Sequence, residues 1–254
     1  MSLNEQTNLL FLSAEPPNTT NGTKTTNGTK TVAGLVVDKE LAKKLAAEFV
    51  GTYLLATVIA GGGDGLLIGA ILTAMTFTLK SISGGYFNPA FTFGSLISSQ
   101  LGNKDRKIKT LSLALAYTVT QFLAVLIAAA AETAMTKDTN NATITVPSSK
   151  QGLDWTSVFF TEMLFTFTCV LTMLTNSQKS LTRYGLSLGL IVAVGAHITG
   201  TVFNPPISIV LPAVEGTGNN IEWELIVGPY AGAALAAGFY KIIDWSEEED
   251  KKKE

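Results

Sequence analysis

The stretch Ser83-Gly84-Gly85-Tyr86-Phe87-Asn88-Pro89 has a pattern that occurs again in the second half of the chain. The later copy is Thr199-Gly200-Thr201-Val202-Phe203-Asn204-Pro205. Both copies read as a small hydroxyl residue, a glycine, two variable residues, and then Phe, Asn and Pro. A Gly- and Pro-containing motif that interrupts apolar sequence twice predicts an internal repeat. In such a repeat, interrupted helices form a pore.

The repeat extends upstream to one acidic residue in each half. Glu48 lies in the apolar run 47–55, and Glu162 lies in a similar run, 161–168. Each acid precedes its own Asn-Pro pair by a similar interval. The chain therefore consists of two similar sequence repeats, and we expect them to be inverted relative to each other.

The composition is typical of a membrane protein with polar ends. Hydrophobic residues make up 46% of the 254 positions. Residues 1–40 are expected to form a disordered polar tail and residues 244–254 a charged tail, because both have too little apolar surface to fold alone. A membrane span needs about 20 mostly apolar residues. Six stretches qualify, at about 45–62, 66–83, 109–132, 154–175, 183–199 and 222–243. The sequence predicts an all-α membrane protein with a first repeat at 41–135 and a second at 154–243.

The basic residues predict the orientation of the chain. With six spans, both tails and the connections 80–109 and 176–183 lie on one side, and that side holds most of the Lys and Arg residues. The positive-inside rule therefore predicts cytosolic termini. The loop 136–153 is then external, and Asn141 is the candidate glycosylation site in it. The net charge of −2 argues against nucleic acid as a partner.

Each Asn-Pro pair is followed by an apolar run of about ten residues, which is too short to span a bilayer. We predict half-helices over 89–99 and 205–214, dipping into the membrane from opposite faces. Asn is a preferred helix N-cap and Pro a preferred first helical residue. The two N-termini should then meet near the midplane, with both positive ends directed at one spot.

The loops that lead to the asparagines must cross part of the membrane without helical structure, which is tolerated where their carbonyls line a wet path. The expected pore-lining carbonyls are those of Gly84, Gly85, Tyr86, Gly200 and Val202. Asn88 and Asn204 are each expected to cap their own helix and to offer amide N–H groups to a passing molecule. Glu48 and Glu162 are expected to be structural acids that accept hydrogen bonds from backbone N–H groups of the loops.

On these residues the chain resembles the major intrinsic protein family, the aquaporins and aquaglyceroporins, over roughly 40–243. The matching motifs are the Glu-bearing first and fourth spans, the whole stretch 83–94, Gln-Phe-Leu at 121–123 and Gly-Pro-Tyr-Ala-Gly-Ala at 228–233. The resemblance implies an hourglass of six helices and two half-helices. It also implies a homotetramer in the lipid bilayer, with one pore per subunit for passive flux of water and small neutral solutes. No cofactor or metal is expected.

The chain departs from the family pattern at two places. The second signature is Asn-Pro-Pro, so that Pro206 adds bulk beside the midplane asparagine. The family's outer selectivity filter normally has an arginine three residues after the second Asn, and here that position is Ile207. The resemblance carries the remaining filter positions over to Ile68, Val192 and Thr201.

Without the arginine, a narrow and partly dehydrated site lacks a donor, and a missing partner there costs about 1–3 kcal/mol. Two outcomes stay open: an apolar constriction that dewets, or a wider one that passes less polar neutral solutes. We favour the second. Ser208 stands where glycerol channels have an acid, so that specialisation for glycerol is not indicated.

The first functional hypothesis is therefore a passive channel for water and/or small uncharged solutes. The alternative is a junction or adhesion protein that keeps the fold and conducts little. A coupled transporter would need intramembrane charges beyond the two acids. An enzyme is not expected, because His197 and Cys169 are the only His and Cys. A packing role for His197 is favoured over a pH gate. The plasma membrane and an intracellular membrane both remain open.

Overall fold

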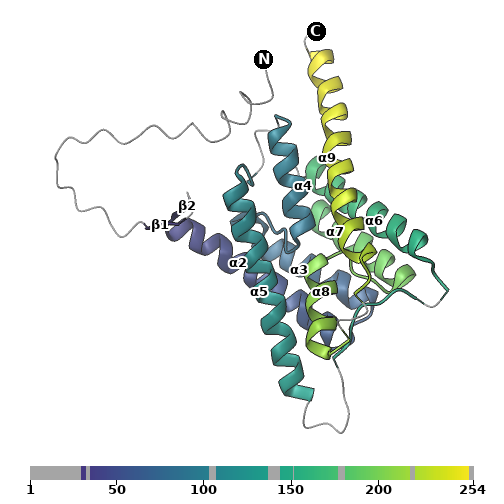
Figure 1. Ribbon diagram of the computed structural model, residues 1–254. Helices are drawn as coiled ribbons and strands as arrows, with labels where there is room; N and C mark the ends of the chain where they lie inside the picture. Colours follow the sequence, from purple (N-terminus) through teal and green to yellow (C-terminus); the bar gives the residue numbers. More distant parts are fainter. Residues whose placement is uncertain are drawn as a thin grey trace, which may run out of the picture.

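The computed structural model describes residues 30–32, 35–102, 107–136, 144–150, 152–176, 181–217 and 221–251 (Figure 1). Two short strands precede a bundle of helices. In the first half the helices are α2 (Lys39–Ala60), α3 (Gly65–Ser83), α4 (Pro89–Gln100) and α5 (Leu111–Thr136). In the second half they are α6 (Trp155–Asn176), α7 (Leu181–Thr199), α8 (Pro205–Glu215) and α9 (Glu224–Lys251). The order long, long, short, long occurs twice, which confirms the predicted fold class.

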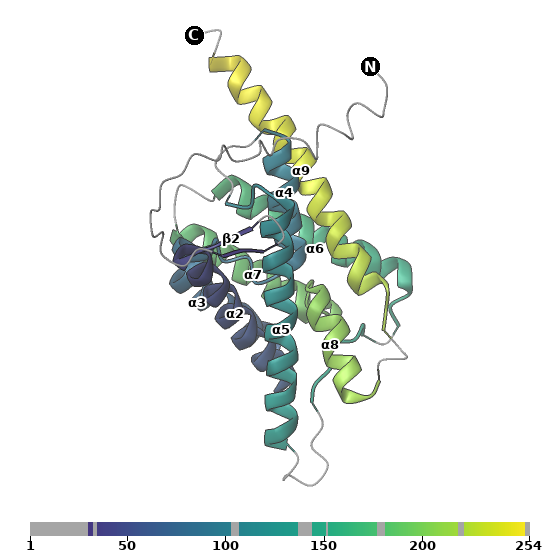
Figure 2. The same cartoon turned by 60° about the vertical axis from the view of Figure 1, so that its left-hand side comes forward.

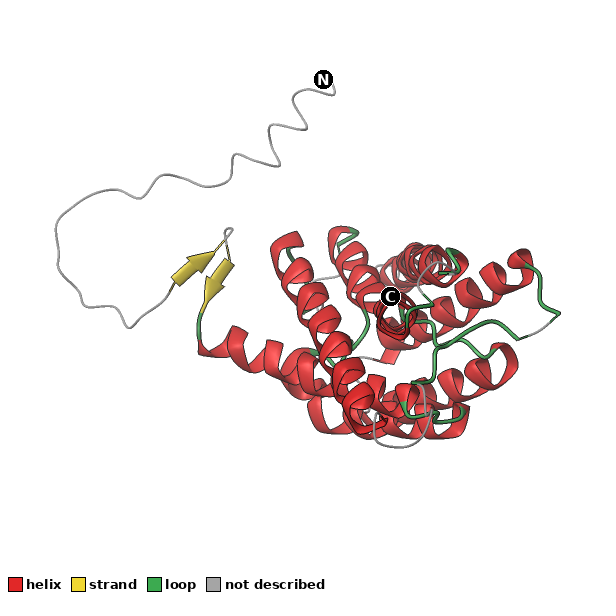
Figure 3. Ribbon diagram, turned by 60° about the horizontal axis from the view of Figure 1, so that its bottom comes forward, coloured by secondary structure: helices red, strands yellow, loops and turns green. Residues whose placement is uncertain are grey.

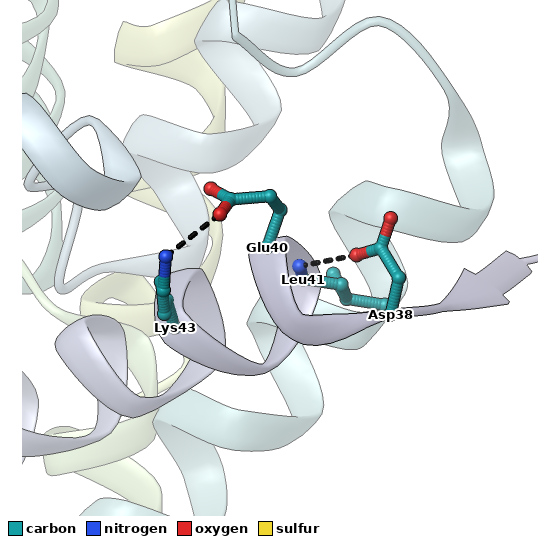
Figure 4. A network of polar contacts seen from close by, with 4 residues as sticks. All are labelled: Asp38, Glu40, Leu41 and Lys43. Carbon is teal, nitrogen blue, oxygen red and sulfur yellow. Dashed lines mark hydrogen bonds and ion pairs between the residues drawn. The ribbon is translucent and has the colours of Figure 1, made fainter. Parts of the chain in front are cut away.

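Local capping chemistry sets where the long helices begin. Asp38 precedes α2, and its carboxylate accepts a hydrogen bond from the backbone N–H of Leu41 at 2.8 Å (Figure 4). In the same first turn, the ammonium group of Lys43 donates to Glu40 at 2.7 Å. Asp64 caps α3 in the same way, accepting from the N–H of Leu67 at 3.0 Å. Such caps satisfy N–H groups that a helix start leaves without partners.

Five helices of the described chain are long and apolar enough to cross a membrane: α3, α5, α6, α7 and α9. Helix α2 has 22 residues but carries Lys43, Lys44 and Glu48 in its sequence. Its length still exceeds the roughly 20 residues that a span requires. The outside of the bundle is apolar, as the exposed Leu115, Val119 and Leu123 of α5 illustrate.

The two short helices lie in opposite halves of the molecule. In Figures 1 and 2, α4 extends from the centre toward the end where α9 finishes, whereas α8 extends toward the other end. The long helices pack as equivalent pairs, α2 with α5 and α6 with α9, and α3 packs against α7 across the two halves. Both half-helices therefore start at the centre, as an inverted repeat requires.

Two stretches expected to belong to the tails have regular structure. Strands β1 (Lys30–Val32) and β2 (Leu35–Val37) pair antiparallel, with Lys30 opposite Val37 (Figure 3). At the other end, α9 continues through residues 244–251 instead of stopping at 243. Residues 1–29 and Asn141 lie outside the described residues.

Candidate functional site

The residues directly before the two asparagines have an unusual backbone conformation. Phe87 has φ of 50° and Phe203 has φ of 55°, and they are the non-glycine residues with positive φ in the described chain. A non-glycine residue with positive φ costs about 1–3 kcal/mol in conformational energy. Such a conformation persists only where the surrounding structure holds it in place. The ring of Phe87 lies so close to Gly51 that a Cβ on that glycine would stand 2.1 Å away, and a Cβ on Gly195 would stand 2.5 Å from the ring of Phe203.

This shared turn lets each loop offer its carbonyl to the asparagine of the other loop. The side-chain amide of Asn88 donates to the Phe203 carbonyl at 2.7 Å. The amide of Asn204 donates to the Phe87 carbonyl at 3.0 Å. Both asparagines are buried. The reciprocal bonds join the tips of α4 and α8. Each amide uses one of its two N–H groups in this way, where the sequence alone suggested that both faced the lumen.

The expectation that both asparagines cap their own helices is confirmed for Asn88 and wrong for Asn204. The side-chain oxygen of Asn88 accepts from the backbone N–H of Ala90 at 2.9 Å. The side-chain oxygen of Asn204 is buried and accepts no hydrogen bond from the described residues. The physical reason is Pro206, which stands at the position of Ala90 in the second repeat and has no N–H to donate.

Glu48 anchors the first loop. Its Oε1 accepts from the hydroxyl of Ser83 at 2.6 Å and from the backbone N–H of Tyr86 at 3.0 Å. Its Oε2 accepts from the backbone N–H of Phe87 at 2.7 Å and from the amide of Gln121 at 2.9 Å. The side chain is fully buried. Four donors thus hold one carboxyl group, two of them from the strained loop, as expected for a structural acid.

Glu162 occupies the same place in the second repeat but has a different environment. It is also buried, and it faces the hydroxyl of Thr201 and the backbone N–H of Phe203. Within the described part of the chain, neither of its oxygens lies within hydrogen-bonding geometry of a donor. The hydroxyl of Thr201 instead pairs with that of Thr199 at 2.7 Å. The second loop is therefore held less firmly by its acid than the first.

A narrow cavity lies beside the joined tips, with room for about one water molecule. Both asparagines border it, together with Ile68, Val192, Tyr86 and Val202 of the expected site residues. Thr201 and Ile207 are not among its lining residues, and both are fully buried. Gly84, Gly85 and Gly200 have positive φ and form the bends of the two loops.

Several lining residues carried no signal that singled them out in the sequence. These are Leu55 and Ile59 of α2, Leu72 of α3, Phe91 of α4 and Phe87. All are apolar residues inside apolar helices or next to a motif, so that they look like ordinary core. The repeated Phe-Asn-Pro was the one signal that could have pointed to the carbonyls of Phe87 and Phe203.

The arrangement combines an apolar wall with two carboxamides at the positive ends of two half-helices. A small molecule with a lone pair can accept hydrogen bonds from the remaining amide N–H groups, whereas a cation meets two helix ends of its own sign. His197 lies at the far end of α7, where its backbone carbonyl accepts from the ammonium of Lys150. His197 is not among the residues that line this cavity.

The end of α3 that leads into the first loop is closed by a lysine. The ammonium of Lys107 donates to the carbonyls of Lys80 at 3.0 Å and Ser81 at 2.8 Å. A cation is favoured at a helix C-terminus. Burial lowers the pKa of Lys107, and the charge of Lys44 lowers it further.

These features define a helical membrane protein in which two opposed half-helices meet at the centre through asparagines. The model of the family called Major intrinsic protein matches residues 35–240. The chain belongs to the major intrinsic protein family.

Relatives and one solved structure agree with this assignment. A glycerol uptake facilitator protein-like 6 of Lactiplantibacillus plantarum is 30% identical over 220 residues, which cover 79% of this chain and 98% of the relative. Aquaporin TIP1-2 of Zea mays is 28% identical and covers 80% of this chain and 87% of its own. The fold matches that of the aquaglyceroporin from Plasmodium falciparum with a TM-score of 0.60 at 18% identity, over 79% of this chain and 96% of the other.

Proposed function

We propose that this protein is a passive channel for water and/or small uncharged solutes. The observation that carries the proposal is the reciprocal pairing of Asn88 and Asn204 with the carbonyls of the opposite loops. It joins two helix N-termini beside an apolar cavity. No charged side chain borders that cavity among the described residues. Neutral molecules suit such a path, because a cation would lose its hydration and face two positive helix ends.

The names of the relatives support the same proposal, since they are a glycerol uptake facilitator and an aquaporin. They favour a transport role over the junction or adhesion alternative, and channel proteins over enzymes. We propose the outer filter at Ile68, Val192, Thr201 and Ile207. The presence of Ile68 and Val192 in the cavity wall supports it. We also propose a homotetramer, which the resemblance to the family implies. We propose cytosolic termini as well, for which the distribution of basic residues is the support.

Stopped-flow measurements on proteoliposomes test the function. Vesicles containing the protein are compared with empty vesicles for flux of water, urea, glycerol and ammonia. Val192→Phe is expected to reduce the flux, because it adds volume to the cavity wall. Val194→Phe is the matched control, since Val194 is on the same helix but is 53% exposed on its outer face.

The proposal requires flux above that of empty vesicles for at least one neutral solute, with Val194→Phe close to the wild type. Both variants must first elute as monodisperse protein with helical circular dichroism. Wild-type protein that passes none of these molecules contradicts the proposal and favours the adhesion alternative. Flux that depends on a proton or sodium gradient contradicts the passive mechanism.

A further inference from the structure

Helices α3 and α7 pack through a row of small residues on each helix. A Cβ on Gly69 would stand 2.3 Å from the carbonyl oxygen of Gly189, and one on Gly65 would stand 2.5 Å from that of Ala193. One turn further on, the hydroxyl of Thr73 donates to the carbonyl of Gly185 at 3.2 Å. Residues four apart share a helix face. The contact therefore follows one continuous row along each helix.

A second row of mostly buried residues runs beside the contact row on each helix. On α3 it contains Ile68, Leu72, Thr76 and Lys80, and on α7 it contains Val192, Leu188 and Tyr184. Ile68, Leu72 and Val192 line the central cavity. Because the helices are antiparallel, Lys80 near the end of α3 and Tyr184 near the start of α7 close these rows at the same end. We call this the inner end, since the basic connections are predicted to lie there.

The two terminal residues of these rows touch. The ammonium nitrogen of Lys80 lies 3.5 Å from the centre of the Tyr184 ring. A cation within about 6 Å of a ring centre is attracted to its negative face. Tyr184 is fully buried, so that the ring is fixed, while Lys80 is half-buried. The charge is therefore held at a defined place instead of swinging with its long side chain.

The backbone of Lys80 also adjoins the first loop. Its carbonyl accepts from the backbone N–H of Gly84 at 3.0 Å. A Cβ on Gly85 would stand 3.2 Å from the Cα of Lys80. The loop that leads to Asn88 thus starts against this residue. A second positive charge, on Lys107, closes the same helix end.

We propose that Lys80, seated on the ring of Tyr184, is the charge-selecting residue of the inner mouth and keeps cations out of the path. This inference rests on the proposed channel function. Among the described residues, neither the lining of the central cavity nor the proposed filter includes a cationic side chain, so that the fixed ammonium supplies a positive charge that they lack. Like charges repel more strongly in a partly desolvated mouth than in bulk water.

The experiment compares pairs of permeants that differ in charge but little in size. Guanidinium influx is measured against urea influx in proteoliposomes, and proton influx against water flux. Lys80→Gln is expected to raise both cation-to-neutral ratios by about tenfold or more, because the fixed positive charge that repels cations is removed. Lys80→Arg keeps the charge and is expected to stay near the wild type.

Two further variants separate position from charge. Tyr184→Phe keeps the ring face and is expected to behave as the wild type, whereas Tyr184→Leu releases the ammonium and is expected to raise the ratios less than Lys80→Gln does. Lys43→Gln is the control for net charge, because Lys43 is exposed on α2 and paired with Glu40.

Unchanged ratios in a well-folded Lys80→Gln protein that still passes neutral solutes overturn this inference and leave the channel function standing. If Lys80→Gln does not yield monodisperse protein, Tyr184→Leu decides in the same way. Wild-type protein that passes no neutral solute overturns the channel function itself, and this inference with it.

Discussion

Asn88 and Asn204 occupy the same position of the two repeats, but only Asn88 has a hydrogen-bond partner for its side-chain oxygen. That oxygen accepts from the backbone N–H of Ala90, whereas the residue at the corresponding position after Asn204 is Pro206, which has no N–H to donate. A buried acceptor without a partner costs about 1–3 kcal/mol. At the junction of the two half-helices, the asparagine of the first repeat therefore contributes more stabilisation than the asparagine of the second.

Pro206→Ala is expected to stabilise the protein. The new N–H at residue 206 can donate to Asn204, and a side-chain cap contributes about 0.5–2 kcal/mol. Pro205→Ala is the matched control, because it also removes a proline but supplies an N–H at the first helical position. An N–H at that position has no partner within the helix. The thermal unfolding midpoint in detergent should be higher for Pro206→Ala than for Pro205→Ala. Equal midpoints would mean that the oxygen of Asn204 already has a partner, such as a bound water.

Glu48→Gln is expected to destabilise the protein more than Glu162→Gln. A glutamine keeps one acceptor oxygen, so that two of the four donors around residue 48 would face an NH2 group. We expect a loss of about 1–3 kcal/mol in the free energy of unfolding. At residue 162 neither oxygen accepts a hydrogen bond, and the loss should be small. Unfolding of both variants in detergent checks this, and a larger effect at 162 would contradict it.

Asn88→Asp is expected to weaken the junction and the flux together. The aspartate keeps an oxygen that can accept from the N–H of Ala90 but removes the donor to the carbonyl of Phe203. Its second carboxylate oxygen would then face the carbonyl oxygen of Phe203, which is a repulsive contact. Losing the bond should lower the free energy of unfolding by about 1–3 kcal/mol, with a further penalty for a buried charge. Unfolding in detergent and stopped-flow flux measure the two effects. A variant as stable as the wild type would exclude a structural role for this bond.

Gly189→Ala is expected to separate α3 from α7. The added Cβ would stand 1.9 Å from the hydroxyl oxygen of Thr73 and 2.4 Å from the carbonyl of Gly69. Overpacking of this kind costs about 1–3 kcal/mol. Gly238→Ala in α9 is the control, because nothing lies within 4 Å of its added Cβ, and Ala favours a helix over Gly by up to about 1 kcal/mol. Thermal unfolding should rank Gly238→Ala at or above the wild type and Gly189→Ala below it.

The repeat, the helical class and the start of each half-helix followed from the sequence. Helices α4 and α8 begin at Pro89 and Pro205, directly after the asparagines, because an N-cap and a first-position proline are local chemistry. The four donors around Glu48 were only partly foreseen. Its bonds to the loop N–H groups were expected, but those to Ser83 and Gln121 depend on residues brought together by three different segments.

Local features of the sequence were enough to predict two copies of one motif between apolar segments of opposite orientation, because periodicity, capping residues and charge can be recognised along the chain without knowledge of distant contacts. The tertiary structure alone decided that each carboxamide bonds to the carbonyl of the other loop, and that Glu162 does not copy Glu48. It also decided that Ile68 and Val192 border the cavity while Thr201 turns toward Thr199. These outcomes depend on which groups from distant segments reach hydrogen-bonding distance, and a repeat in sequence does not make the two environments equal.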